Sequence, residues 1–425
     1  MSRIYTASDV ERAAQAGTSL RLAPGERLTP LARDRAKELG VALDDRLEPE
    51  RTAAVQPAAG ARTAPASAAS SAPRVPAAEA AMKARPLALG ASGALYRRHA
   101  LGPSTSLGAS RVADRRPKAG VVGAGHVGAM AALRLAQSDL FSEVAMIDVV
   151  PGLAEGLALD MWHGAGLYGF STRLRGSSEL SELRDARYII ITAGKARQPG
   201  MSRTDLTAVN AAIMKTVAQA VAAHAPQATL VVVSNPLEEM THLAARYTGF
   251  PDERVLGMAG VLDSARFCSL IGLTGRVRPQ QVRALALGSH GPEMVIPLSQ
   301  ATADGKPIEQ LLDAAELGAI VERTRESGGE VVKLLQKGSA YFSPAESAAT
   351  MVRAMVRDDG EVLAACVRSR GAYGTQDTRV GLPVRLTQSG LKEIVALELR
   401  SHEGKALQEA AARIAARIAE LPSGD

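Results

Sequence analysis

The sequence predicts an α/β fold in which a doubly wound parallel sheet is followed by an α+β domain and preceded by a short helical extension. Three segments carry this prediction. Residues 119–136 have the pattern of strand, glycine turn and helix, residues 144–148 that of a buried strand ending in an aspartate, and residues 231–236 that of a strand ending in an Asn-Pro turn. In a doubly wound sheet, such strand ends meet at the edge where ligands bind.

The glycine turn has the spacing of a dinucleotide site. Gly123 permits the turn, Gly125 lets the backbone approach a pyrophosphate, and Gly128 allows the next helix to pack closely on the strand. Asp148 ends the following strand, twenty residues after Gly128, where a carboxylate binds the ribose of the cofactor. That carboxylate would repel a 2′-phosphate, and no cation follows it to compensate. We therefore predict a Rossmann domain that binds NAD in preference to NADP.

A loop with two cations follows the apolar run of residues 188–192. Arg197 and Arg203 lie six residues apart in this loop, which contains glycine and proline. Arginine binds a carboxylate through two parallel hydrogen bonds, so two such groups suit a substrate with negative charge at both ends. The pattern favours a small dicarboxylate. The alternative is that both arginines are solvated loop residues.

Three further residues complete a candidate catalytic group. Asp263 and Arg266 are three residues apart and share one face of a predicted helix. His290 lies between small residues in the segment 287–291. A lone histidine is more often structural than catalytic, but this one accompanies a carboxylate partner, a carboxylate-binding arginine and a dinucleotide fold. We therefore expect His290 to transfer a proton.

From about Lys118 to Asp425, the chain resembles malate dehydrogenases of the lactate-dehydrogenase-like type. The similar motifs, in order, are the glycine turn with Asp148, the double-arginine loop, Ser234-Asn235-Pro236, residues 262–267, His290, and residues 338–342, 371–374 and 380–384. The resemblance implies NAD-dependent, reversible conversion of malate to oxaloacetate, a place in the tricarboxylic acid cycle, and a homodimer or homotetramer. The alternatives are a dehydrogenase for another 2-hydroxy acid, of lactate type, and a non-catalytic scaffold or microcompartment cargo protein that keeps the fold.

The resemblance also implies a role for each site residue. His290 accepts the proton of malate and Asp263 holds its ring, while Arg266 binds the carboxylate beside the reacting carbon. Arg203 polarises the substrate carbonyl, and Arg197 binds the distal carboxylate that lactate-specific relatives do not recognise.

The resemblance also assigns roles to two asparagines, and the chain departs from the family pattern at two places. Asn210 and Asn235 are implied at the cofactor, and Asn235 also at the substrate. Relatives usually have proline where this chain has Ala196, and an aspartate where it continues with Pro292 and Glu293. Proline fixes φ and removes an amide donor, so the hydrogen bonding beside His290 is expected to differ.

Charge and cysteine content limit the other function classes. The net charge of +6 comes from residues 46–118, which hold 12 Lys and Arg against 4 Asp and Glu, whereas residues 119–425 hold 31 against 33. The basic tract lacks interleaved aromatic residues, so nucleic-acid binding is not expected. The two cysteines, Cys268 and Cys366, are predicted to be buried thiols in a reducing cytosol. Neither a metal site nor a membrane span is suggested, and a cytoplasmic protein is expected.

The extension is predicted to contain two helices. Ser8 to Glu11 form a capping-box pattern before the first helix, which Gly17 ends, and Thr29-Pro30 begins a second helix that Gly40 ends. Residues 28–41 weakly resemble a motif of proteins from bacterial microcompartment loci, and they half-resemble the peripheral-subunit-binding domain of 2-oxoacid dehydrogenase complexes.

We predict a helical arm at residues 1–45, a basic Ala/Pro/Ser-rich linker at 46–117, the NAD domain at 118–262 and the substrate domain at 263–425. The arm is either a dispensable extension, a module that docks on a partner or microcompartment shell, or the product of a misassigned start codon.

Overall fold

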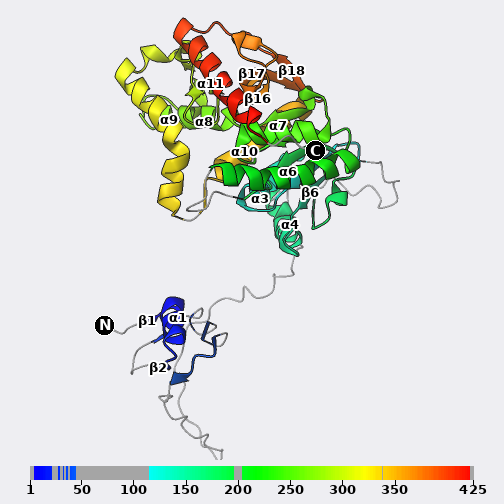
Figure 1. Cartoon of the computed structure of the whole chain (residues 1–425), viewed down its shortest axis with the longest axis vertical. Coiled ribbons are helices and arrows are strands. Elements are labelled where there is room, and N and C mark those ends of the chain that lie inside the picture. The colour runs from blue at the N-terminus through cyan, green and yellow to red at the C-terminus, as the bar shows by residue number, and fades with distance from the viewer. Residues whose placement is uncertain are drawn as a thin grey trace, which may run out of the picture. The chain divides into compact units, whose positions relative to one another are not determined.

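The computed structural model describes residues 4–21, 27–28, 32, 35–36, 39–44, 114–195, 203–336 and 338–421. These residues fall into two compact units (Figure 1). The N-terminal unit comprises the described residues between 4 and 44, and the main unit comprises those between 114 and 421. Each unit is described by itself.

The first half of the main unit is a parallel sheet of six strands. The strands are β5 (Lys118–Val122), β6 (Glu143–Ile147), β7 (Arg173–Ser177), β8 (Ala186–Ile191), β9 (Thr229–Val232) and β10 (Val255–Gly257). Their order across the sheet is β7-β6-β5-β8-β9-β10, so the chain starts in the middle and reverses direction between β5 and β8. This is the order of a doubly wound dinucleotide fold, which confirms the predicted fold class.

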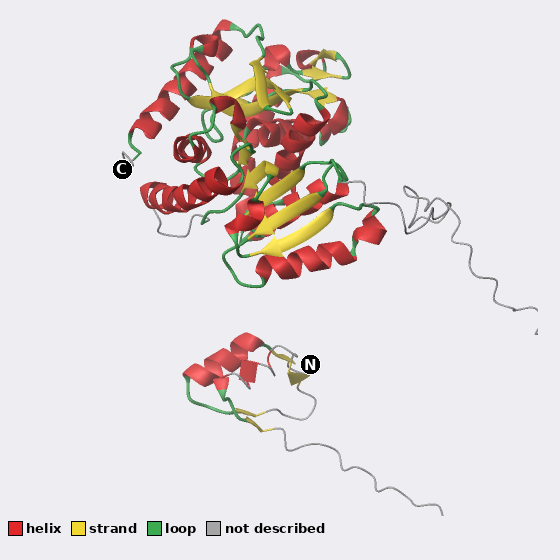
Figure 2. Ribbon diagram, turned by 90° about the vertical axis from the view of Figure 1, so that its right-hand side faces the viewer, coloured by secondary structure: helices red, strands yellow, loops and turns green. Residues whose placement is uncertain are grey.

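Helices cover both faces of these strands (Figure 2). Alternate residues of a strand point to opposite faces. Val121 and Ile190 therefore pack in one core and Val122 and Ile191 in another. The first core is covered by α3 (His126–Gln137), α4 (Leu153–His163) and α10 (Phe342–Arg357), and the second by α6 (Arg203–His224) and α7 (Leu237–Thr248). Both faces are apolar, which explains why the strands have continuous apolar sequences.

The second half continues the same sheet with antiparallel strands. They are β16 (Val362–Arg368), β17 (Arg379–Thr387), β18 (Gly390–Ile394), β12 (Leu287–Gly288) and β13 (Met294–Val295), and β16 pairs with β10. A third core lies under α8 (Gly260–Gly272) and α9 (Ala314–Leu335), beside a small sheet of β11 (Val282–Arg283), β14 (Thr302–Ala303) and β15 (Lys306–Pro307). The helix α11 (Ser401–Ala419) packs across β17, β12 and α7.

The remaining elements are short. They are α5 (Ala165–Tyr168) and the 3₁₀ helices η2 (Leu180–Leu183), η3 (Asp252–Arg254), η4 (Pro279–Gln281), η5 (Leu298–Gln300), η6 (Ile308–Gln310) and η7 (Ala372–Gly374).

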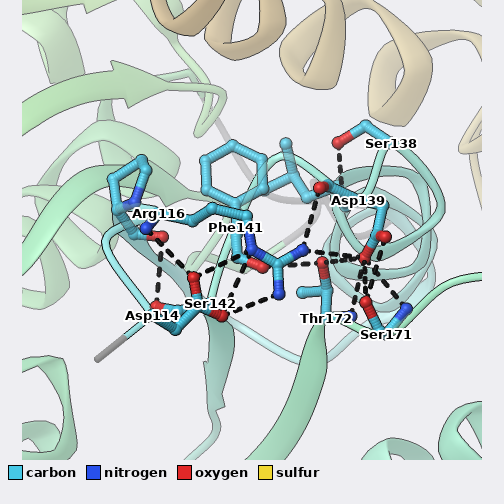
Figure 3. Close-up of polar contacts among 10 residues, drawn as sticks. Asp114, Arg116, Ser138, Asp139, Phe141, Ser142, Ser171 and Thr172 are labelled. Atoms are coloured by element: carbon cyan, nitrogen blue, oxygen red, sulfur yellow. Dashed lines mark hydrogen bonds and ion pairs between the residues drawn. The ribbon is translucent and has the colours of Figure 1, made fainter. Parts of the chain in front are cut away.

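A cluster of polar contacts fixes the start of the main unit (Figure 3). Asp139 follows α3 with a positive φ of 52°, and its Oδ1 accepts hydrogen bonds from the backbone and hydroxyl groups of Ser171 and Thr172. Arg116 donates to the same oxygen at 3.0 Å and also binds Asp114. Burial would raise the pKa of Asp139, but these hydrogen bonds lower it below its usual value. The chain is thus held in place two residues before β5 begins.

Among the described residues, one helical segment is long and apolar enough to cross a membrane, judged by length and composition alone. This segment is Thr204–His224. Its Met214, Val217 and Val221 lie in the core that α6 shares with the sheet. Both cysteines are free: Cys366 is buried as predicted, whereas Cys268 is only partly buried.

The N-terminal unit has strands that the sequence did not predict. The helix α1 (Ala7–Gln15) is present, but its capping box is formed by Thr6 and Asp9, not by Ser8 and Glu11. Gly17 and Gly40 have φ of 63° and 66°, as expected for residues that end helices. The second helix is seen only in part, with Ala32, Arg35, Ala36 and Leu39 in helical conformation. The strands β1 (Ile4–Tyr5), β2 (Leu20–Arg21), β3 (Arg27–Leu28) and β4 (Leu43–Asp44) frame the two helices.

The pairing of these strands reveals an internal repeat. β1 pairs with β3 and β2 with β4, both in parallel, and each paired residue is 23 positions from its partner. The sequence repeats at the same spacing. Identical residues are Thr6 and Thr29, Arg12 and Arg35, Ala13 and Ala36, Gly17 and Gly40, and Leu20 and Leu43. The unit is therefore two interleaved β-α-β halves. They share a small core of Tyr5, Val10, Leu20, Ala32 and Ala36.

Candidate functional site

The turn after β5 has the shape needed to hold a dinucleotide pyrophosphate. Gly123 has a φ of 101°, which side chains rarely tolerate. A Cβ on Gly128 would lie 1.7 Å from the carbonyl oxygen of Gly123, so only glycine lets α3 pack this closely on the turn. A Cβ on Gly125 would meet no atom within 4 Å, so the backbone there is open to a ligand at the N-terminus of α3. These residues fit NAD.

Asp148 lies at the end of β6, beside this turn. Its Oδ2 accepts a hydrogen bond from the backbone N–H of Ala124 at 2.7 Å, and its Oδ1 accepts one from Val150 at 3.0 Å. The carboxylate therefore both supports the glycine turn and lies next to the place where a bound pyrophosphate would continue into ribose.

A carboxylate orients the histidine of the β12–β13 hairpin. His290 is in the loop of this hairpin, and its Nδ1 lies 2.8 Å from Oδ2 of Asp263. Asp263 is in the first turn of α8 and is 1% exposed. Arg266, one helical turn later, donates to the other oxygen of Asp263 at 3.1 Å. The structure thus brings His290, Asp263 and Arg266 together, and this contact leaves the second ring nitrogen of the histidine on the other side of the ring.

The charges around His290 favour its protonated form. Burial alone would lower the pKa of His290, but the nearby carboxylates of Asp263 and Glu238 raise it above its usual value. An imidazole with this pKa can hold the proton that it takes from a hydroxyl group, and Arg266 beside it can bind an acidic substrate.

Glu238 is a residue of this site that the sequence reasoning missed. Its Oε1 accepts a hydrogen bond of 2.6 Å from the backbone N–H of His290, and the side chain is buried. Burial raises the pKa of Glu238, and the hydrogen bond from His290 partly offsets that effect. Acidic residues are common in the first turn of a helix because they interact favourably with its dipole, so this role was hard to predict from the sequence. The only signal was a pair of carboxylates, Glu238 and Glu239, directly after the Asn235-Pro236 motif.

Asn210 joins two strand ends through its side chain. Its Oδ1 accepts a hydrogen bond from the backbone N–H of Lys195 at 2.8 Å, and its Nδ2 donates to the carbonyl oxygens of Lys195 and Asn235. The amide is buried and engaged by the protein. Asn210 therefore fixes the positions of Lys195 and Asn235.

The two loop arginines lie at or beyond the limit of the described residues. Arg203 is the first residue of α6, and nothing is described of its side chain. Arg197, with Ala196, lies outside the described residues.

A contact between two aromatic rings connects the C-terminal half to the glycine turn. Tyr341 is the N-cap of α10, and its ring centroid lies 5.1 Å from that of His126, the first residue of α3. The later motif at residues 338–342 therefore reaches the NAD turn, although the two are more than 200 residues apart.

Comparisons with protein families match both halves of the main unit. Residues 117–257 match the NAD binding domain of lactate/malate dehydrogenases, and residues 260–423 match their alpha/beta C-terminal domain. The predicted NAD cofactor is thereby confirmed.

Individual relatives agree. Malate dehydrogenase of Chlorobium luteolum is 43% identical over 68% of this chain and 94% of its own length. Malate dehydrogenase of Trichormus variabilis is 40% identical over 74% of this chain and 97% of its own. The solved structure of Salinibacter ruber malate dehydrogenase has a TM-score of 0.68 and 38% identity, covering 71% of this chain and 96% of that one. Lactate dehydrogenase of Cryptosporidium parvum, solved with lactic acid and nicotinamide adenine dinucleotide, has a TM-score of 0.68 and 30% identity, covering 72% and 99%.

Proposed function

The chain belongs to the lactate/malate dehydrogenase family, and we propose that it converts malate and NAD⁺ reversibly to oxaloacetate and NADH. The curated relatives at 40% and 43% identity are named malate dehydrogenase. Residues with the chemistry for this reaction are grouped at the carboxyl edge of the sheet.

The observation that carries the proposal is a series of hydrogen bonds from the NAD turn to the histidine loop. Each bond joins the end of one strand to a neighbouring segment. The bonds run from Thr192 Oγ1 to Gly123 O (3.0 Å), Ser234 Oγ to Ala193 O (2.6 Å), Asn210 Nδ2 to Asn235 O (2.7 Å) and His290 N to Glu238 Oε1 (2.6 Å). These connections support our assignment of the dinucleotide turn and the proton-transfer pair to a single site.

His290 moves the proton in this mechanism. Its Nδ1 is engaged by Asp263, so Nε2 takes the hydroxyl proton of malate. Asp263 stabilises the imidazolium that forms, and Arg266 binds the carboxylate next to the reacting carbon. Hydride acceptance is the chemistry that NAD supplies when bound. In the reverse direction, His290 returns its proton to the oxygen of oxaloacetate.

The distal carboxylate of malate is assigned to Arg197. Arg203, at the start of α6, polarises the carbonyl oxygen, and Asn235 contacts the substrate and the nicotinamide side. The charge of Arg197 supports a dicarboxylate over lactate or pyruvate, because a carboxylate can pair with this cation and a methyl group cannot.

A single set of assays tests the proposal. Purified full-length protein is supplied with oxaloacetate or pyruvate, each with NADH or NADPH, and kcat/KM is measured. We expect oxaloacetate with NADH to be the best pair, and NADPH to be at least ~10-fold worse because Asp148 would face its 2′-phosphate. Better turnover of pyruvate would indicate the lactate-type alternative, and no turnover of either would indicate a scaffold.

A homodimer or homotetramer is part of the proposal. Large apolar side chains are exposed around α4 and α5, including Leu159, Trp162, Leu167 and Tyr168, and Leu167 is 67% exposed. Large apolar side chains exposed on two consecutive helices favour an interface, and we assign this surface to a second copy of the chain. Light scattering should give a mass of two or four chains, and Leu167→Glu should lower it.

The N-terminal unit is proposed to dock the enzyme on a partner, such as a microcompartment shell, within the cytoplasm. Leu39 is 40% exposed and available to such a partner. Fusing residues 1–45 to a fluorescent reporter in the native host tests this role. A punctate signal that Leu39→Asp disperses is expected, and a diffuse signal from the unchanged fusion would contradict it.

A further inference from the structure

The loop that carries His290 is hydrogen-bonded to the first turn of α7. This loop, residues 289–293, connects β12 to β13. Glu238 accepts the backbone N–H of His290 at 2.6 Å, which is a charge-assisted geometry. Asp263 orients the imidazole ring from α8. Ring and backbone of His290 are therefore held by two different helices.

The far end of the loop is tied to α7 through the C-terminal helix. Arg417 of α11 lies with its Nε 3.1 Å from Oε1 of Glu239 and its Nη1 3.6 Å from Oε1 of Glu293. Glu293 is the last residue of the loop, and Glu239 is the neighbour of Glu238 in α7. The guanidinium of Arg417 thus connects the end of the loop to α7, and α7 also binds His290 within the loop.

Burying two adjacent carboxylates is costly unless each has a partner. Glu238 and Glu239 are both 2% exposed. Glu238 interacts electrostatically with several titratable groups. They include His290 from the hairpin, Cys366 from β16 and Glu239 from its own helix. A helix needing only stability would place apolar residues here, so the arrangement indicates that the bonds to the loop are the reason for the charges.

We propose that Glu238 is a positioning residue that fixes the backbone of His290 for proton transfer, and that Arg417, through Glu239 and Glu293, secures the other end of the same loop. This inference rests on the proposed function for its kinetic consequence. Glu238 acts on the reaction through His290 and does not touch the substrate. A displaced imidazole costs rate because proton transfer requires a hydrogen-bonded geometry between Nε2 and the substrate oxygen.

The test compares Glu238→Ala with Glu238→Gln in the full-length enzyme. The alanine variant removes the acceptor and should lower kcat by ~10–100-fold, as loss of a supporting hydrogen bond does at other sites, with the Kd of NADH unchanged. Glutamine keeps an acceptor oxygen without the charge, so it should recover most of that loss. A glutamine variant as slow as alanine, or an alanine variant within about twofold of the parent, would overturn the positioning role.

Hydrogen exchange provides a readout that needs no turnover. In Glu238→Ala, the peptide containing residues 286–295 should exchange faster than in the parent. Arg417→Met should speed exchange of the same peptide from its other end and lower kcat by a smaller factor. If the parent lacks malate dehydrogenase activity, the proposed function fails. The exchange result alone then tests whether Glu238 and Arg417 hold the loop of residues 289–293. Unchanged exchange in Glu238→Ala contradicts the inference whatever the activity.

Glu403→Ala is the matched control. Glu403 is a buried carboxylate of α11 that accepts the backbone N–H of Ser299 at 3.1 Å, a bond of the same type away from His290. Its loss should lower Tm while kcat and exchange of residues 286–295 stay at parent values. An equal loss of kcat in this variant would mean that general destabilisation explains the effect of Glu238→Ala.

Discussion

The N-terminal unit and the main unit differ in what their cores can hold. The described core of the N-terminal unit has five buried apolar residues, and its strands are two residues long. The main unit has three extensive cores, and among them it buries the carboxylates of Asp263, Glu238 and Glu239. A buried charge needs a rigid surrounding that supplies partners from several elements, and only a large core can provide it.

This difference indicates that the two units have different functions, with catalysis in the main unit and partner recognition in the N-terminal unit. His290, to which we assign the proton transfer, is held by groups on two separate helices, α7 and α8. The N-terminal unit offers short elements and surface side chains, which suit recognition of a partner. Three predictions change site residues of the main unit, the fourth shortens its start, and the fifth breaks the N-terminal unit, in order of decreasing expected effect on activity.

The largest effect is expected at the proton-transfer residue. His290→Asn should lower kcat by ~10²–10⁴-fold, because an amide cannot exchange a proton with the substrate near neutral pH. NADH should still bind, since the glycine turn is unchanged, and fluorescence titration measures this. Near-normal turnover would show that another group moves the proton.

The next effect is on substrate choice. Arg197→Gln removes the cation assigned to the distal carboxylate, and loss of such a pair costs about 2–5 kcal/mol, or at least ~30-fold in kcat/KM for oxaloacetate. Pyruvate turnover should be kept or raised, because its methyl group no longer faces a cation. Steady-state kinetics with both substrates decide this, and equal losses would contradict the assignment.

The third prediction concerns pH. Asp263 helps to raise the pKa of His290, so Asp263→Asn should lower that pKa and reduce kcat by ~10–100-fold. Malate oxidation requires neutral His290, so its rise with pH should shift to lower pH. Oxaloacetate reduction requires protonated His290, so its decline should also begin at lower pH. Profiles of kcat/KM in both directions measure the shift, and a loss of rate without one would assign Asp263 an orienting role alone.

Sequence reasoning succeeded where a residue type is required by local geometry. Gly123 and Gly128 were identifiable because a positive φ and a 1.7 Å Cβ approach exclude other residues. Asp263 and Arg266 were placed on one face because helix periodicity fixes it. His290 joined them through its motif, although 27 residues separate it from Asp263.

Long-range contacts escaped the sequence for a physical reason. Glu238 bonds to a backbone N–H 52 residues away, and a backbone group leaves no mark in the sequence. The strands of the N-terminal unit were missed because two residues are too few for an alternating pattern. The 23-residue repeat was visible as a weak self-similarity, and pairing of β1 with β3 gives it meaning.

The boundary of the main unit gives the fourth prediction, on stability. A variant starting at Asp114 keeps the bond between Arg116 and Asp139, whereas one starting at Lys118 loses it. Loss of this part-exposed charged bond should cost about 1–2 kcal/mol and lower Tm by ~2–5 °C. Both variants should turn over like the full chain, since the site lies elsewhere. Equal Tm values would show that the cluster in Figure 3 does not secure the start of the unit.

The smallest effect on activity is expected from breaking the N-terminal unit itself. Val10 is fully buried in its core, so Val10→Asp places a charge among apolar side chains and should unfold residues 4–44. Limited proteolysis should then cleave this region quickly, while kcat and the Tm of the main unit stay within about 20% and ~1 °C of the parent values. Gln15→Asp, at an exposed position of the same helix, is the matched control and should leave the region protected. If Val10→Asp also disperses the reporter fusion, the docking role depends on the folded repeat. A loss of kcat in this variant would mean that the two units share the catalytic function and that this separation of functions is wrong.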